Sequence, residues 1–102
     1  MPIDKHVNGN DVELTLRRAT TNGEATVVVV GDFNDWSPDA HPMTAEGHGW
    51  TCTFTLAVGK RYRFRYLLDG RRWENDWEAD DYVDNDYGGQ DSVVDLTTVP
   101  LD

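Results

Sequence analysis

The sequence predicts an antiparallel β-sandwich, and three observations lead to this fold class. Apolar and polar residues alternate with a period of two along most of the chain, as they do in strands with one buried face. Turn-forming residues interrupt these runs about every 8–12 residues, which is the spacing of short strands in a sandwich. No segment keeps a helical period over three turns. At 102 residues, we expect one domain. About seven strands are expected.

The first half of the chain contains two predicted strands. Residues 11–18 alternate apolar and polar side chains, which indicates a half-buried strand. The Asn22-Gly23 pair then predicts a tight turn. The β-branched run at residues 27–30 predicts a central strand that is covered on both faces.

The second half continues the same pattern. Residues 50–57 place apolar side chains on one face and threonines on the other. In residues 61–68, aromatic and leucine side chains alternate with outward arginines. Asp69-Gly70 predicts a hairpin turn, after which residues 71–74 begin the return strand. Residues 92–96 are expected to form the last strand.

These alternations also predict the core and the limits of the domain. Eight side chains are expected to contribute to the core: Val28, Val30, Trp50, Cys52, Phe54, Tyr62, Phe64 and Val93. The segments 1–9 and 97–102 are expected to be loose, as chain ends commonly are. Residues 10–96 therefore remain as the predicted domain.

Composition limits the classes of partner. The formal net charge of -10 and the pI of about 4.4 disfavour nucleic acid and anionic membranes, whereas a neutral partner is little affected. Cys52 is the single cysteine, so no internal disulfide is possible, and its apolar face predicts an inert core thiol. The first ten residues contain no apolar run, and no stretch approaches the roughly 20 apolar residues of a membrane span. We therefore expect a cytoplasmic protein.

The sequence gives little support for catalysis or metal binding. His6, His41 and His48 occupy loop-like surroundings without metal-ligand spacing. Residues 84–95 match a calcium loop only in part, because the fifth place lacks a side-chain oxygen and no helices flank the segment. The carboxylates of residues 73–81 could form a glycosidase pair, but a small sandwich has little material to enclose a sugar ring. We expect no enzymatic activity, no cofactor and no metal.

Charge is unevenly distributed along the chain. Six of the nine Lys and Arg residues lie in 60–72, and eight of the nineteen acidic residues lie in 74–91. One interpretation is a solvated strand face beside an acidic loop that neutralises it. The other is that an arginine on the exposed face belongs to a ligand site.

Two stretches remain to be explained: VVVVGDFNDWSP at 27–38, and YRFRYLLDGRRWENDWEADDYVDNDYGGQDSVVDL at 62–96. With their G-x-F-N-x-W turn and D-G-x-x-W hairpin, they resemble carbohydrate-binding module family 48, over residues 10–96. Members of that family are immunoglobulin-like domains of the early set. They precede the catalytic barrel of glycogen-branching and debranching enzymes and form the glycogen-binding domain of the AMP-activated protein kinase beta subunit. The chain is most similar in kind to short bacterial proteins made of this domain alone.

The resemblance implies non-catalytic binding of an α-1,4-glucan, such as glycogen, starch or a maltooligosaccharide. The implied site consists of two tryptophans, a basic residue and two residues of the last loop. In this sequence those positions are Trp36, Trp73, Arg65, Tyr87 and Asp91. The kinase domain has lysine, leucine and asparagine at the last three, so those positions differ in type.

The chemistry of sugars agrees with such a site. Pyranose rings present C–H groups that pack against the electron-rich faces of aromatic rings. Arg65 is on the outward side of its strand, and Trp73 lies just across the hairpin turn, so the two can share a face. Guanidinium and carboxylate groups can then hydrogen-bond the equatorial hydroxyls.

Alternatives remain open. Tryptophans beside turns also plug the ends of sandwiches, and Arg65 could pair with the acidic loop instead. Trp50 is expected in the core, and Trp77 is assigned no role. A function of a different class is an interaction domain whose sheet face or strand edge binds another protein. Trp36 and Trp73 that are exposed and coplanar enough to form one platform would favour sugar binding. Their burial, or their cover by a second chain, would favour the interaction domain.

Overall fold

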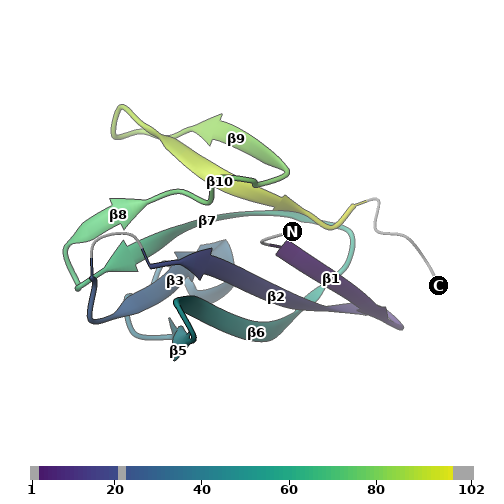
Figure 1. Ribbon diagram of the computed structural model, residues 1–102. Helices are drawn as coiled ribbons and strands as arrows, with labels where there is room; N and C mark the ends of the chain where they lie inside the picture. Colours follow the sequence, from purple (N-terminus) through teal and green to yellow (C-terminus); the bar gives the residue numbers. More distant parts are fainter. Residues whose placement is uncertain (1–2, 21–22, 98–102) are drawn as a thin grey trace.

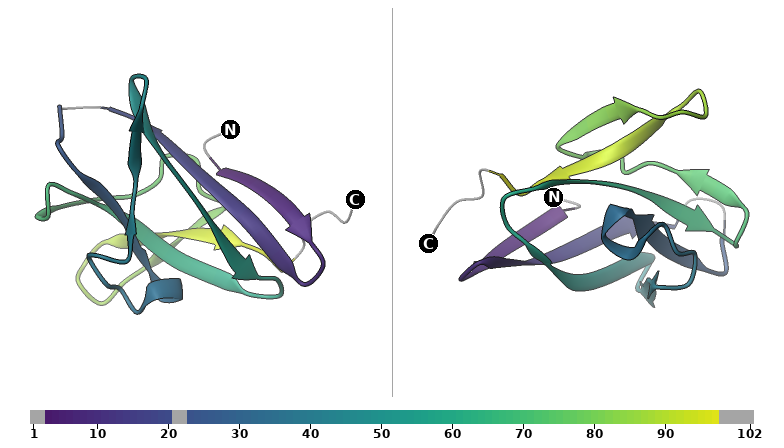
Figure 2. Two further views of the ribbon diagram at one scale, coloured as in Figure 1. Left: turned by 90° about the horizontal axis from the view of Figure 1, so that it is seen from below. Right: turned by 180° about the vertical axis from the view of Figure 1, so that it is seen from behind.

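Two antiparallel sheets packed face to face form the fold of the computed structural model, which describes residues 3–20 and 23–97 (Figure 1). One sheet has the strand order β1-β2-β6-β5, and the other has the order β4-β3-β7-β10-β9 with β8 paired to β7. The strands of the first sheet are β1 (Ile3–Asn8), β2 (Asp11–Ala19), β5 (Thr44–Glu46) and β6 (Gly49–Ala57). Those of the second are β3 (Val27–Gly31), β4 (His41–Pro42), β7 (Arg61–Leu68), β8 (Arg72–Glu74), β9 (Asp81–Asp84) and β10 (Gln90–Asp95). The predicted antiparallel β-sandwich is confirmed, and Figure 2 shows its two layers from below and from behind.

The described residues contain more strands than the alternation of apolar residues indicates. Strands β4 and β5 have only two and three residues. Strand β9 has two aspartates among its four residues. Such short or polar strands are held by backbone hydrogen bonds to longer neighbours, and they leave little trace in the pattern of side chains.

The N-terminal segment differs from the prediction. Residues 3–8, expected to be loose, form β1, which pairs with β2 along its whole length (Figure 1). Ile3 is buried, and the ammonium group of Lys5 lies 2.7 Å from a carboxylate oxygen of Asp80. Because its attachment depends on backbone pairing and an ion pair, apolar periodicity does not reveal it. Residues 1–2 and 98–102 and the predicted turn residue Asn22 lie outside the described residues.

The core lies between the two sheets and is built from strands of both. Its most deeply buried side chains come from β2, β3, β7 and the end of β10: Val12, Leu14, Leu16, Val27, Val29, Phe64, Tyr66, Leu68, Val94 and Leu96. Full burial of one such side chain contributes about 1.5–3 kcal/mol. The predicted core residues Tyr62 and Phe64 are confirmed.

Three predicted core residues of β6 are only half-buried. Trp50, Cys52 and Phe54 pack against the margin of the core. Strand β6 lies between β2 and the short edge strand β5, which pairs only with residues 49–51. The rings of Phe33 and His41, 4.9 and 4.6 Å from that of Phe54 between centroids, complete this margin.

The prediction for the valine run was wrong about which face of β3 points to the core, because it placed Val28 and Val30 there. Val27 and Val29 face the core, whereas Val28 is half-buried on the outer face and Val30 is buried there. Val93 is likewise buried outside the inter-sheet core. Four consecutive valines have no alternation, so the sequence does not determine which of them point inward.

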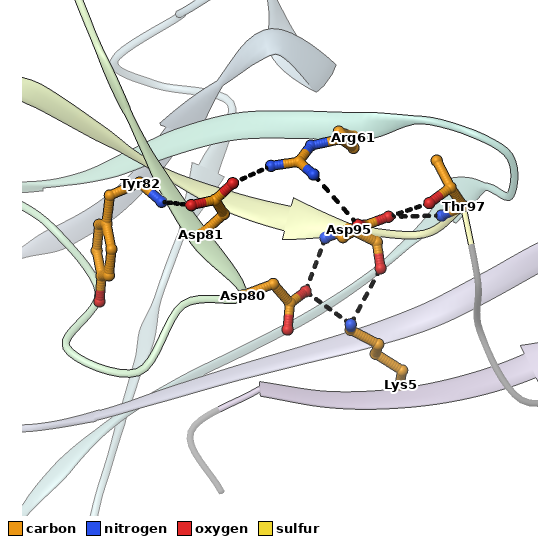
Figure 3. Close-up of polar contacts among 7 residues, drawn as sticks. All are labelled: Lys5, Arg61, Asp80, Asp81, Tyr82, Asp95 and Thr97. Carbon is orange, nitrogen blue, oxygen red and sulfur yellow. Dashed lines mark hydrogen bonds and ion pairs between the residues drawn. The ribbon is translucent and has the colours of Figure 1, made fainter.

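A network of charged side chains joins one end of the two sheets (Figure 3). Arg61 on β7 bonds Asp81 on β9 and lies 3.4 Å from an oxygen of Asp95 on β10. Lys5 on β1 donates to the carboxylate of Asp80 and to the backbone carbonyl of Asp95, at 2.7 and 3.0 Å. The network therefore connects three strands of the large sheet to an edge strand of the small one.

The network predicts a dependence of stability on acid pH. The backbone N–H of Tyr82, followed by Arg61, lowers the pKa of Asp81 below its ordinary value of 3.8. Hydrogen bonds from Thr97 lower the pKa of Asp95 in the same direction. A lowered folded-state pKa means that these carboxylates stabilise the fold above the ordinary carboxyl pKa, and that this stabilisation is lost as pH falls through the lowered values.

We therefore expect a double variant, Asp81→Asn with Asp95→Asn, to lose less stability than the wild type on acidification. Urea unfolding of both proteins at about pH 6 and at about pH 3 measures the difference. The effect should be modest because Asp81 is exposed and Asp95 is only half-buried. An equal loss of stability in the two proteins would show that Asp81 and Asp95 do not cause the acid dependence.

Candidate functional site

The turn after β3 is built around Gly31 and Asn34. A Cβ at Gly31 would lie 2.3 Å from the backbone oxygen of Arg63, so only glycine fits at this place. The Asn34 side chain accepts a hydrogen bond from the Gly31 N–H at 3.1 Å and donates to the Val29 carbonyl at 2.9 Å. The short 3₁₀ helix η1 (Asp32–Asn34) follows from these contacts.

Trp36 is held at the end of this turn by Asp32. The indole Nε1 donates to Asp32 Oδ1 at 3.1 Å, and Asp32 Oδ2 accepts from the backbone N–H of Arg63 at 2.9 Å. The backbone of Trp36 has a φ of 56°, which is uncommon for a bulky residue, and its N–H donates to the Gly31 carbonyl. The turn therefore fixes a 36% exposed tryptophan beside β7.

The hairpin of β7 and β8 supplies the second tryptophan. Asp69 and Gly70 turn the chain with φ values of 54° and 72°, as predicted for this pair. Trp73 pairs with Leu67 on the outer face of the sheet, and it is 42% exposed. The guanidinium carbon of Arg65 lies 5.9 Å from the centroid of the Trp73 ring. The cation and the ring therefore form one unit on that face.

A loop connects β9 and β10 (Figure 1). The side chain of Asn85 organises this loop. Its Oδ1 accepts from the backbone N–H groups of Tyr87 and Gly89, at 2.9 and 3.1 Å. Its Nδ2 donates to Oδ1 of Asp91 at 3.1 Å. Tyr87 is 95% exposed at the tip of this loop.

These three segments meet around one open groove of about 730 Å³, here called the Trp36–Trp73 groove. Its walls contain all five residues that the resemblance marks: Trp36, Arg65, Trp73, Tyr87 and Asp91. Four further residues line it: Asp32, Arg63, Asn85 and Asp86. Arg63 could have been found from the sequence, because it precedes Arg65 by two residues and so shares its face. The positions of the other three depend on turn geometry, which the alternation of apolar and polar residues does not predict.

The two arginines of the groove have different surroundings. Arg63 Nη1 lies 3.9 Å from Oδ2 of the buried Asp91. Arg65 has no ion-pair or hydrogen-bond partner for its side chain within the described part of the chain, and its buried Nε is unpaired. Pairing with the acidic loop is therefore the role of Arg63, and Arg65 keeps its N–H groups free for another acceptor.

Two of the residues considered for metal binding or covalent chemistry, His41 and Cys52, lie beside the core. The His41 ring lies on Phe54, and its Nδ1 is 2.8 Å from the amide nitrogen of Asn34. Burial raises the pKa of the Cys52 thiol, which favours its protonated form. Over residues 3–20 and 23–97, no three His, Cys, Asp or Glu side chains gather in a way that could hold a metal ion. Nor does that part of the chain form a helix of the length and apolarity needed to cross a membrane.

Comparison with protein families gives one match. The model described as carbohydrate-binding module 48 (isoamylase N-terminal domain) matches residues 22–83, which is more than half of the chain. This range includes the turn that carries Trp36 and the hairpin that carries Arg65 and Trp73. No curated protein matches the chain significantly.

Proposed function

The chain belongs to carbohydrate-binding module family 48, whose fold is immunoglobulin-like, and on this premise we propose that it binds α-1,4-glucan without catalysing a reaction. Glycogen, starch and maltooligosaccharides are the ligands of this class. The observation that carries the proposal is that two exposed tryptophans and an unpaired arginine line one open groove. We also propose the cytoplasm as its location, because a single cysteine suits a reducing compartment.

Trp36 and Trp73 offer flat apolar surface to the C–H faces of the sugar rings. Arg65, held over Trp73, donates hydrogen bonds to the hydroxyls at the ring edge. Tyr87 supplies a third ring from the tip of the last loop. The open form of the groove suits a segment of a long chain, which enters and leaves along the surface.

Asp91 has a different role in this proposal from the one that the resemblance implies. It is buried, one of its carboxylate oxygens accepts from Asn85, and the other faces Arg63. Asp91 therefore positions Arg63 and the loop of Asn85, and those residues contact the sugar in its place.

The charges along the groove favour a neutral ligand. The two arginines, Arg63 and Arg65, are opposed by three carboxylates, those of Asp32, Asp86 and Asp91. An anionic sugar would gain little from such a mixed field, whereas a neutral glucan uses both kinds of group as hydrogen-bond partners.

Arg65→Ala is expected to weaken glucan binding about three- to tenfold, because it removes hydrogen bonds but leaves both rings. Binding by the wild type should change little with salt, since the ligand is neutral. Titration of maltoheptaose at low and high salt measures both effects. Arg72→Ala is the matched control, because Arg72 lies on the same hairpin but outside the groove lining. An equal loss in the control, or a steep decline with salt, would contradict the assigned role.

Sedimentation of the purified protein with glycogen tests the function itself. We expect the protein to pellet with glycogen, to be released by maltoheptaose, and to liberate no reducing sugar during incubation. Failure to pellet would exclude glycogen binding and favour an interaction domain that binds another protein. Release of reducing sugar that a single carboxylate substitution abolishes would exclude the non-catalytic assignment.

A further inference from the structure

A second cavity, of about 460 Å³, lies on the opposite side of the β7–β8 hairpin from the Trp36–Trp73 groove. Its walls include Arg17, Arg18, Tyr66, Asp76, Trp77 and Glu78, and it is called here the Trp77 cavity. Successive residues of a strand point to opposite faces. The pair Leu67–Trp73 therefore faces the groove side, and the pair Tyr66–Glu74 faces the cavity side.

The floor of the Trp77 cavity contains a buried arginine with free donors. The Arg18 side chain is 6% exposed, and its guanidinium carbon lies 5.1 Å from the centroid of the Tyr66 ring. Its Nη2 donates to Glu74 at 2.9 Å, but Nε and Nη1 have no partner among the described residues. Unpaired buried donors favour a ligand that brings hydrogen-bond acceptors, such as hydroxyl groups.

The wall of the cavity is an exposed indole on a fixed turn. Trp77 is 81% exposed. On one side of it, the backbone N–H of Asp76 donates to Ser92 Oγ, and on the other the N–H of Glu78 donates to Asp76 Oδ1, both at 2.8 Å. The Asp76 carboxylate also accepts from the Tyr66 hydroxyl at 2.6 Å. The turn is therefore anchored to the sheet while its ring remains open to solvent.

Charge around the cavity favours a neutral occupant. Arg17 is paired with Asp4, and Arg18 is paired with Glu74, so neither arginine leaves a free positive charge. The Glu78 carboxylate is exposed at the rim and adds a hydrogen-bond acceptor. An anionic ligand would meet unfavourable carboxylates, whereas a neutral polyhydroxylated ligand finds a ring, donors and an acceptor.

We propose that the Trp77 cavity is a second saccharide-binding site, which takes a neutral sugar unit of the glucan that the Trp36–Trp73 groove binds; this inference rests on the proposed function. Because the two sites lie on opposite faces of one hairpin, a short oligosaccharide lying in the groove does not reach the cavity. A glycogen particle offers many chains, so two of its segments can occupy the sites together and strengthen attachment by avidity.

The test follows each tryptophan separately. The full chain, labelled with 5-fluorotryptophan, gives ¹⁹F resonances for Trp36, Trp50, Trp73 and Trp77, assigned by single Trp→Phe variants. During titration with maltoheptaose, the Trp77 resonance should shift in the wild type and also in the double variant Trp36→Ala with Trp73→Ala. Trp50, which packs against the core, serves as the internal control.

Three outcomes would overturn the second site alone, and a fourth would also overturn the proposed function. Shifts of Trp36 and Trp73 without a shift of Trp77 would leave the proposed function intact and remove the second site. A shift of Trp77 that disappears in the double variant would show that it is relayed from the groove. A shift of the Trp77 resonance that depends on protein concentration and not on sugar would show that the Trp77 cavity is a contact between two copies of the chain. If no tryptophan responds to sugar, the proposed function fails as well.

Glycogen provides the second readout. Trp77→Ala should weaken glycogen binding about tenfold through the loss of avidity, while Trp77→Phe, which keeps a ring, should retain most of it. Both variants should bind maltoheptaose in the groove as the wild type does. Unchanged glycogen binding by Trp77→Ala would overturn the proposal.

Discussion

Replacing either Trp36 or Trp73 by alanine is expected to weaken maltoheptaose binding in the groove at least about tenfold, which corresponds to about 1.4 kcal/mol or more. Each ring presents a large flat surface and loses only two side-chain torsions on binding, so its removal affects affinity more than that of a flexible side chain. Both variants should remain folded, because neither ring belongs to the core between the sheets.

The matched control for these variants is Trp50→Phe, which changes a tryptophan that does not line the groove. Calorimetric titration gives the affinity, and urea unfolding with circular dichroism shows that each variant is folded. Equal affinity in the wild type and in a folded Trp36→Ala or Trp73→Ala variant would contradict the role of these two rings in binding the sugar.

Gly31→Ala should have the largest effect on stability, with a loss of about 3 kcal/mol. An added Cβ would lie 2.3 Å from the Arg63 carbonyl and 2.9 Å from Cβ of Phe64, so the backbones of β3 and β7 must separate. The turn that follows would move with them, because the Gly31 carbonyl accepts from the Trp36 N–H. Stability and sugar binding should therefore fall together, unlike in Trp36→Ala.

Gly89→Ala is the control for this substitution. Its added Cβ would meet only the Asn85 side-chain amide, at 3.8 Å or more, so its stability should stay within about 0.5 kcal/mol of the wild type. Urea unfolding of both variants decides the comparison. A Gly31→Ala protein as stable as the wild type would show that the strands absorb the clash.

The long strands were predictable because burial of one face imposes alternation. Strands β2 and β7 follow it closely, and their inward residues form much of the core. The alternation is lost where both faces of a strand are covered. The valine run of β3 has Val27 and Val29 against the core and Val30 beneath the outer face, and no feature of the run distinguishes them. Strand β1 was missed because edge pairing and the Lys5 ion pair attach it.

The positions of the groove residues were predictable from motifs, and their partners were not. A turn motif locates Trp36, and a hairpin motif locates Trp73 and the arginine beside it. The sequence left open whether Arg65 belongs to a ligand site or pairs with the acidic loop. In the structure that pairing belongs to Arg63, which also alternates outward on β7. The register sets Arg63 opposite Val93 on β10, so its pairing with Asp91 is a diagonal contact between the strands that the register alone does not predict. Burial of Asp91 likewise depends on Asn85, whose side chain closes the loop over it.

The central claim, that the groove binds α-1,4-glucan, is tested most directly by calorimetric titration of the wild-type protein with maltoheptaose. A shallow open site should give saturable binding with a dissociation constant between about micromolar and about millimolar, or about 4–8 kcal/mol. The titration should be nearly independent of salt, and cellobiose, a β-linked disaccharide, should not compete. No heat of binding from folded protein at millimolar maltoheptaose would contradict the claim and leave protein interaction as the function to test.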